Sequence, residues 1–149
     1  MLGPKHSGTV AVRVEVAQAV LGQGDYLRAI ELCEPWIEAA KRRDDFDANV
    51  LFPLHFVYGR GHLIAGSPEL AKESLSMALE LAAKNRAYEY AVPVMEIDLG
   101  RLRWKMTPDK AAAIADVEAA LAKLKARDDT DLAEVKRAET WLAQTKPKR

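Results

Sequence analysis

Cysteine is nearly absent from this chain of 149 residues, and so is any excess of charge. The single thiol, Cys33, excludes a disulfide within the chain and a zinc site built from several cysteines. The 22 basic residues are balanced by 22 acidic ones. This balance argues against a dedicated binder of nucleic acid or of an anionic membrane, because such proteins concentrate cations against phosphates.

Long apolar runs are missing as well. No stretch approaches the roughly 18 residues that a membrane-spanning helix needs, and residues 1–10 lack the apolar segment of a secretory signal. We therefore expect a cytoplasmic protein without a membrane partner. A chain of this length buries roughly 70% of the surface that its unfolded form exposes, which is enough for one domain with a core of its own.

A helical pattern runs along almost the whole chain. Apolar residues recur at i, i+3, i+4 and i+7 between glycines and prolines, which predicts helices and no strand. The seven expected helices cover residues 9–22, 26–42, 47–64, 68–84, 88–105, 109–126 and 131–144. Asp25, Ser67 with Pro68, and Thr107 with Pro108 are start signals for the second, fourth and sixth helices. Because the connections are short, consecutive helices are expected to pair as antiparallel hairpins.

The predicted hairpins repeat with a period of 42 residues. Ala29 of the second helix aligns with Ala71 of the fourth and with Ala113 of the sixth. A fixed period of about 20 to 50 residues is typical of stacked arrays, in which each unit buries its apolar face against the next. We expect these alanines, together with Gly59 and Gly100, where the two helices of a hairpin cross closely.

The stretch Gln-Gly-Asp-Tyr-Leu-Arg-Ala-Ile-Glu at residues 23–31 resembles the turn and second-helix start of a tetratricopeptide repeat. Tyr58-Gly59 and Leu99-Gly100 stand where that family has Leu-Gly. The resemblance covers roughly residues 10–126. It implies an all-α, right-handed solenoid of about seven helices, with three hairpins and a C-terminal capping helix.

The chain departs from the family pattern in three ways. The family's first-helix tryptophan is replaced by Arg13, His55 and Glu96, and its closing proline is missing from all three units. The period also exceeds the usual repeat of about 34 residues. Longer helices of this kind resemble the extended arrays found in bacterial signal-transduction regulators.

One domain is expected over residues 9–145, preceded by a disordered lead at 1–8 and followed by a tail at 146–149. The last helix has no partner after it. Its apolar stripe predicts a helix that caps the array, and it consists of Leu132, Val135, Ala138, Trp141 and Leu142.

The residue types that usually support catalysis are not brought together by any spacing in the sequence. His55 and His62 lie seven residues apart, too far to share a metal without a third ligand. Cys33 lies in an apolar stripe and is expected to be buried and inert. The sequence therefore predicts no enzyme, no metal site and no cofactor.

Two further motifs also have structural explanations. Gly59-Arg60-Gly61 lies inside a helical pattern, whereas a phosphate loop precedes a helix. The acidic clusters at residues 44–47 and 128–131 lack the spacing of a calcium loop. We interpret them as carboxylates at helix starts, where the helix dipole favours negative charge.

The family resemblance also implies a binding surface. First helices of successive hairpins line the concave side of such arrays, and transferring the groove positions gives nine residues: Val14, Gln18, Leu21, Phe56, Arg60, Leu63, Ile97, Arg101 and Trp104. Large apolar side chains flanked by two arginines fit an acidic or amphipathic peptide or helix. The implied function is a non-catalytic scaffold for protein–protein interaction.

Two alternative functions remain open at this stage. In the first, the chain is a ligand-sensing regulatory domain of a larger signalling protein, with a small effector on the concave face. In the second, the chain is a dimerising domain, with Trp36 or Trp141 at the contact between two copies.

Overall fold

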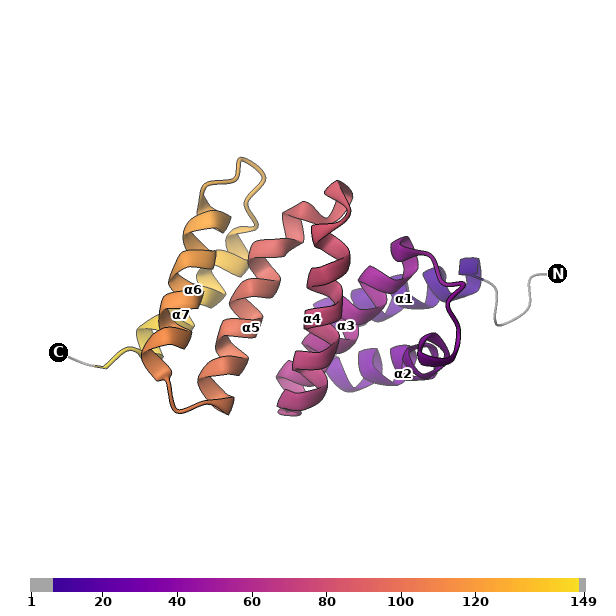
Figure 1. Cartoon of the computed structure of the whole chain (residues 1–149), viewed down its shortest axis with the longest axis horizontal. Helices are drawn as coiled ribbons and strands as arrows, with labels where there is room; N and C mark the ends of the chain where they lie inside the picture. Colours follow the sequence, from indigo (N-terminus) through magenta and orange to yellow (C-terminus); the bar gives the residue numbers. More distant parts are fainter. Residues whose placement is uncertain (1–6, 148–149) are drawn as a thin grey trace.

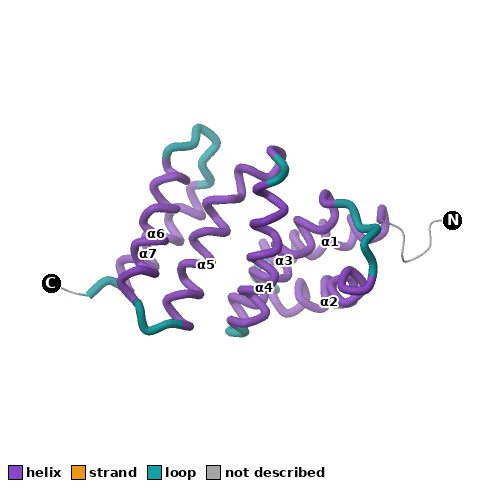
Figure 2. The backbone as a smooth tube through the Cα atoms, viewed as in Figure 1, coloured by secondary structure: helices purple, strands orange, loops and turns teal. Residues whose placement is uncertain are grey.

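The computed structural model describes residues 7–147, and all regular secondary structure in this range is helical. Seven α-helices follow one another, with a short 3-10 helix, η1, before the fifth (Figures 1 and 2). Their bounds are α1 (Ser7–Gly22), α2 (Tyr26–Arg42), α3 (Ala48–Ala65), α4 (Pro68–Ala83), η1 (Arg86–Ala91), α5 (Val92–Met106), α6 (Lys110–Lys125) and α7 (Leu132–Thr145). The all-α prediction is confirmed. Residues 1–6 and 148–149, which contain most of the expected lead and half of the tail, lie outside the described residues.

Capping carboxylates fix several helix starts. Asp25, Asp47 and Asp131 accept hydrogen bonds from backbone N–H groups in the first turns of α2, α3 and α7, as the sequence predicted for these acids. The sixth helix is different, because Asp109 and not Thr107 is its cap. The Asp109 carboxylate accepts from the backbone N–H of Ala112 at 3.0 Å.

The largest difference between the predicted and the observed helix bounds is at α5. This helix starts at residue 92, because η1 occupies residues 86–91 where the sequence predicted the first turn of an α-helix. The side chain of Asn85 caps η1 by accepting from the backbone N–H of Ala87. Pro93 then lies in the first turn of α5, where a missing N–H costs nothing.

The seven helices pack in chain order. Each α-helix contacts the next, and α1 also contacts α3, as α3 contacts α5. Figure 1 shows the result as a row that runs from α1 and α2 near one end of the molecule to α6 and α7 near the other.

The buried apolar side chains form three clusters along this row. The first joins α1, α2 and α3, the second joins α3, α4, η1 and α5, and the third joins α5, α6 and α7. Each helix therefore buries its apolar face against its neighbours in the sequence rather than against one central core.

Small residues allow the closest helix contacts, as predicted. A Cβ atom built on Gly59 would lie 2.7 Å from Cγ of Leu75, and one built on Gly100 would lie 2.6 Å from Cγ2 of Val117. Ala29, Ala71 and Ala113 are fully buried. The two glycine contacts are equivalent, so they align the α3/α4 pair with the α5/α6 pair residue by residue.

The last helix follows its predicted stripe with one exception. Val135, Ala138 and Leu142 are buried, but Leu132 is 77% exposed. The expectation for Leu132 is wrong because it is the first residue of α7, one turn before the buried face of the helix begins at Val135.

Cys33 and Trp36 both belong to the first apolar cluster. Cys33 is fully buried, as predicted, and its burial raises the pKa of the thiol to about 12. Trp36 belongs to the first apolar cluster, so it is not an exposed contact for a second copy. Within residues 7–147, no helix combines the length and the apolar character needed to span a membrane.

Candidate functional site

Three of the nine predicted groove residues are part of the core. Val14, Leu63 and Ile97 are buried, one in each apolar cluster. The expectation that they line an open groove is therefore wrong, because each points toward the neighbouring helices. Leu21 is half-buried against the first cluster, and Gln18 is exposed on α1.

Phe56 is also mainly a packing residue. Its half-buried ring contacts both the second and the third apolar cluster. It stacks on Phe52 with the ring centroids 5.6 Å apart, and the guanidinium carbon of Arg60 lies 5.4 Å from its centroid. Phe56 therefore joins two parts of the core and supports Arg60 from one side.

Arg60 is the most constrained of the predicted residues. Its side chain is only 15% exposed, and its Nε lies 2.9 Å from Oδ2 of Asp98 on α5. Its two terminal nitrogens donate to both carboxylate oxygens of Glu134 on α7, at 2.8 and 2.9 Å. The expectation that Arg60 faces a partner from an open groove is corrected, since this arginine pairs with carboxylates of the same chain.

Two more arginines complete this cluster. Nη1 of Arg101 lies 3.7 Å from Oδ1 of Asp98, and Nη1 of Arg137 donates to Oε1 of Glu134 at 3.1 Å. We call the five residues Arg60, Asp98, Arg101, Glu134 and Arg137 the ion network. It connects α3, α5 and α7, each of which is separated from the next by one intervening α-helix.

Asp98 is the centre of the ion network and is 1% exposed. Burial raises the pKa of its carboxyl group, and the positive charges of Arg60 and Arg101 counteract this shift. The sequence reasoning did not single out Asp98. A signal was present, because the residues four before, three before and four after it are Val94, Met95 and Leu102, all buried.

A shallow hollow lies between α5 and α7, beside the ion network. Its volume is about 430 Å³, and it is lined by Arg101, Ala133, Lys136, Arg137, Thr140, Trp141 and Gln144. Trp104 borders it through an edge-to-face contact with Trp141, with the ring centroids 6.1 Å apart. Of the predicted groove residues, Arg101 therefore lines the α5–α7 hollow, and Trp104 contacts one of its lining side chains.

The α5–α7 hollow has an excess of positive charge. Three of its lining residues are cationic and none carries a carboxylate. The carboxylates of the ion network are Asp98 and Glu134, and both already contact Arg60. Lys136 makes no hydrogen bond or ion pair in the part of the chain that the structure describes. In a chain without net charge, the hollow is therefore a local site of unbalanced positive charge.

The two histidines of α3 do not form a metal site. Among residues 7–147, no group of three histidine, cysteine, aspartate or glutamate side chains is arranged to hold a metal ion. His62 is buried, and its ring meets that of Tyr58 edge to face at 4.5 Å. Burial lowers the pKa of both His55 and His62, so both are neutral near pH 7.

The neutral histidines predict a pH-dependent stability. Unfolded histidine takes up a proton near pH 6.5, whereas burial holds the pKa of His62 lower in the folded protein. The unfolded state therefore binds more protons below about pH 6.5, and the free energy of unfolding falls as the pH decreases. We expect a lower urea midpoint at pH 5.5 than at pH 7.5.

A His62→Phe variant isolates the contribution of this residue. Phenylalanine keeps a ring against Tyr58 but does not titrate, so the difference between the two midpoints is expected to shrink. Glu34 near His62, and Glu73 and Lys41 near His55, remain unchanged in both proteins. An equal pH dependence in the variant and the wild type would contradict the assignment.

Comparison of this chain with protein-family models, with curated proteins and with solved structures gave no match. The ion network and the α5–α7 hollow are therefore the features of this chain that bear on its function.

Proposed function

We propose that this chain is a non-catalytic domain for protein–protein interaction that acts in the cytoplasm. Its proposed architecture is a right-handed, tetratricopeptide-like solenoid of three helical hairpins, with α7 as the cap. The sequential apolar clusters and the equivalent contacts of Gly59 and Gly100 support this arrangement.

The helix caps support the same repeat. The capping residues Asp25 and Asp109 are 84 residues apart, and so are Asp47 and Asp131. This spacing is twice the period of 42 residues read from the alanines. The first pair starts α2 and α6, and the second pair starts α3 and α7. Helices in equivalent places therefore begin with an aspartate that accepts a hydrogen bond from the backbone of the first turn.

The proposed partner is an acidic, amphipathic segment of another protein, bound in the α5–α7 hollow. The observation that carries this proposal is the set of three cations, Arg101, Lys136 and Arg137, without a carboxylate among the lining residues. Guanidinium groups bind carboxylates through paired hydrogen bonds, and tryptophan supplies apolar contact area at interfaces. Trp141 lies in the same hollow, so one segment can meet both kinds of contact.

The ion network prepares this surface for binding. Asp98 and Glu134 hold the guanidinium groups of Arg101 and Arg137 near the hollow, and neither arginine is fully enclosed, with 27% and 57% of their side chains exposed. Side chains that are already held in place lose less conformational entropy when a partner binds. The buried Arg60 thus contributes by positioning rather than by contact with the partner.

A peptide selection tests the proposal. A random peptide library displayed on phage is selected against the protein, and we expect the enriched sequences to combine acidic with aromatic or aliphatic residues. Their affinity should fall at higher salt, because exposed charges are screened. We expect Lys136→Glu to weaken the binding of an enriched peptide at least about tenfold, which corresponds to about 1.4 kcal/mol.

Arg13→Glu is the matched control, since it makes the same change of charge on the exposed surface of α1. The control should bind the peptide as the wild type does. Enriched peptides that are neutral or basic, or an equal loss of binding in the two variants, would argue against a site in the α5–α7 hollow.

A further inference from the structure

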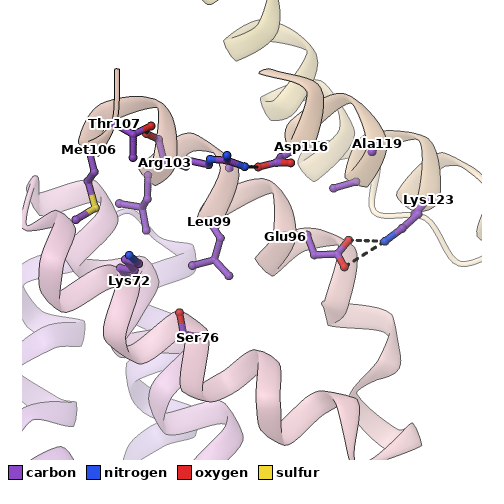
Figure 3. Close-up of a pocket in the computed structure, with 13 residues that line it drawn as sticks. Lys72, Ser76, Glu96, Leu99, Arg103, Met106, Thr107, Asp116, Ala119 and Lys123 are labelled. Carbon is purple, nitrogen blue, oxygen red and sulfur yellow. Dashed lines mark hydrogen bonds and ion pairs between the residues drawn. The ribbon is translucent and has the colours of Figure 1, made fainter. Parts of the chain in front are cut away.

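A larger hollow opens between α4 and α6, over α5 (Figure 3). Its volume is about 590 Å³. Leu99, Leu102, Ala119 and Ala120 are among its lining residues, and more of its lining surface is apolar than polar. None of the nine predicted groove residues lines this α4–α6 hollow, and it lies on other helix faces than the α5–α7 hollow.

The preceding helix pair, α3 and α4, has a different side chain at the equivalent place. The equivalent contacts of Gly59 with Leu75 and of Gly100 with Val117 place Leu99 at the position of Tyr58. Tyr58 is buried, and its ring meets that of His62. Burial, together with the negative charges of acidic residues on α2 and α4, raises the pKa of its hydroxyl group.

One replacement removes a buried aromatic ring from the later helix pair. Leucine at 99 is smaller than the tyrosine at 58. By the same alignment Ala119 of α6 stands where α4 has Met77, and Met77 is 44% exposed. The α4–α6 hollow is therefore the place where one repeat lacks the aromatic ring that the previous repeat contains.

The charges around the hollow are paired on one side only. Arg103 binds Asp116 at 2.6 Å, and Lys123 binds Glu96 at 3.0 Å, so both ion pairs join α5 to α6. Figure 3 shows Arg103 extended toward Asp116, and Glu96 facing Lys123.

The α4 side carries a single cation. Lys72 lines the hollow with Ser76, one turn further along α4, and makes no ion pair or hydrogen bond within residues 7–147. With the other two cations paired to two carboxylates, the lining has one unbalanced positive charge.

We propose that the α4–α6 hollow binds a small aromatic carboxylate. The ring takes the space that Tyr58 fills in the previous repeat and contacts Leu99, Leu102 and the two alanines of α6. The carboxylate pairs with the ammonium group of Lys72 and accepts a hydrogen bond from the hydroxyl of Ser76. One negative charge balances the lining, so a monoanion fits better than a cation or a dianion. This site does not depend on the peptide site of the proposed function.

Titration with 2-naphthoate, followed by NMR of the ¹⁵N-labelled protein, tests this site. We expect saturable binding of one molecule per chain, with the largest shifts at amides of α4, α5 and α6. Lys72→Met should raise Kd about tenfold, because it removes the charge and keeps the length of the side chain. The uncharged 2-naphthamide should lose a similar factor against the wild type, and hexanoate should bind more weakly than 2-naphthoate.

Two further variants complete the design. Leu99→Tyr should abolish binding while the protein stays folded, because the equivalent position already holds Tyr58. Lys105→Met is the control: it removes a lysine of α5 that does not line the hollow, and it should bind 2-naphthoate as the wild type does.

Three results would overturn the proposal: no saturable binding of 2-naphthoate, unchanged affinity in Lys72→Met, or unchanged affinity in Leu99→Tyr. A peptide with a C-terminal phenylalanine provides the remaining comparison. If this peptide saturates the α4–α6 hollow and 2-naphthoate does not, the hollow takes a protein terminus and the small-molecule proposal fails.

Discussion

Replacing Arg60 by alanine is expected to lower the free energy of unfolding by about 3–5 kcal/mol. The reason is that Asp98 would lose its closest cation while it stays buried, and that Glu134 would lose both hydrogen bonds from Arg60. An unpaired buried charge costs far more than the pair itself contributes, because water no longer solvates it. Urea denaturation of the variant and the wild type at neutral pH measures this difference.

An exposed pair provides the control for this measurement. Arg28 pairs with Glu31 on the surface of α2 at 3.2 Å, and both side chains are more than half exposed. We expect Arg28→Ala to change the free energy of unfolding by about 1 kcal/mol or less. If the two alanine variants lose the same amount, the ion network does not hold α3, α5 and α7 together.

A double variant tests whether the loss in Arg60→Ala comes from the buried charge of Asp98, which that variant leaves without its closest cation. Arg60→Met with Asp98→Leu removes the buried charge together with its partner and keeps apolar bulk in both places. We expect it to recover most of the stability that Arg60→Ala loses, since apolar residues often replace buried ion pairs without a large cost.

The second large effect is expected at Gly59. A leucine there should lower the free energy of unfolding by about 3 kcal/mol, because its Cβ would lie 2.7 Å from Cγ and 3.1 Å from the backbone nitrogen of Leu75. The side chain of Leu75 can turn aside, but its backbone cannot move without separating α3 from α4. Thermal unfolding followed by circular dichroism measures the loss as a lower Tm.

Gly22→Leu is the matched control for Gly59→Leu. Gly22 is the last residue of α1, and a Cβ there would meet no atom within 4 Å. We expect this variant to be neutral or slightly more stable, because replacing glycine restricts the unfolded chain. An equal fall of Tm in both variants would mean that the contact with Leu75 does not limit the side chain at position 59.

Local sequence signals were sufficient for most of the fold. The spacing of apolar residues predicted all seven α-helices, and Asp25, Asp47 and Asp131 start helices as expected. The error at α5 has a physical cause, since the 3-10 turn of residues 86–91 depends on tertiary contacts. Tyr88 stacks on Phe52 and donates to Asn49 Oδ1, both in α3, and no pattern within η1 itself predicts those partners.

The candidate site was harder to predict because its partners are far apart in the sequence. Arg60 and Glu134 are separated by 74 residues, so helical spacing gives no information about their pairing. The family resemblance places first-helix residues on an open surface, but here the side chain of Arg60 is largely buried and pairs with Asp98 and Glu134. The exposure of Gln18 and the position of Arg101 beside a hollow were within reach of the sequence, whereas the burial of Val14 and Leu63 depends on how the helices rotate against each other.

The ion network also has a consequence for the order in which the protein folds. Each apolar cluster forms between helices that are neighbours in the chain, so these contacts close short loops and can assemble early. The link from Arg60 to Glu134 closes a loop of 74 residues, about half the chain, and needs α3 and α7 in place at once. We therefore expect the Arg60–Glu134 pair to form after the apolar clusters, because closing a longer loop costs more entropy.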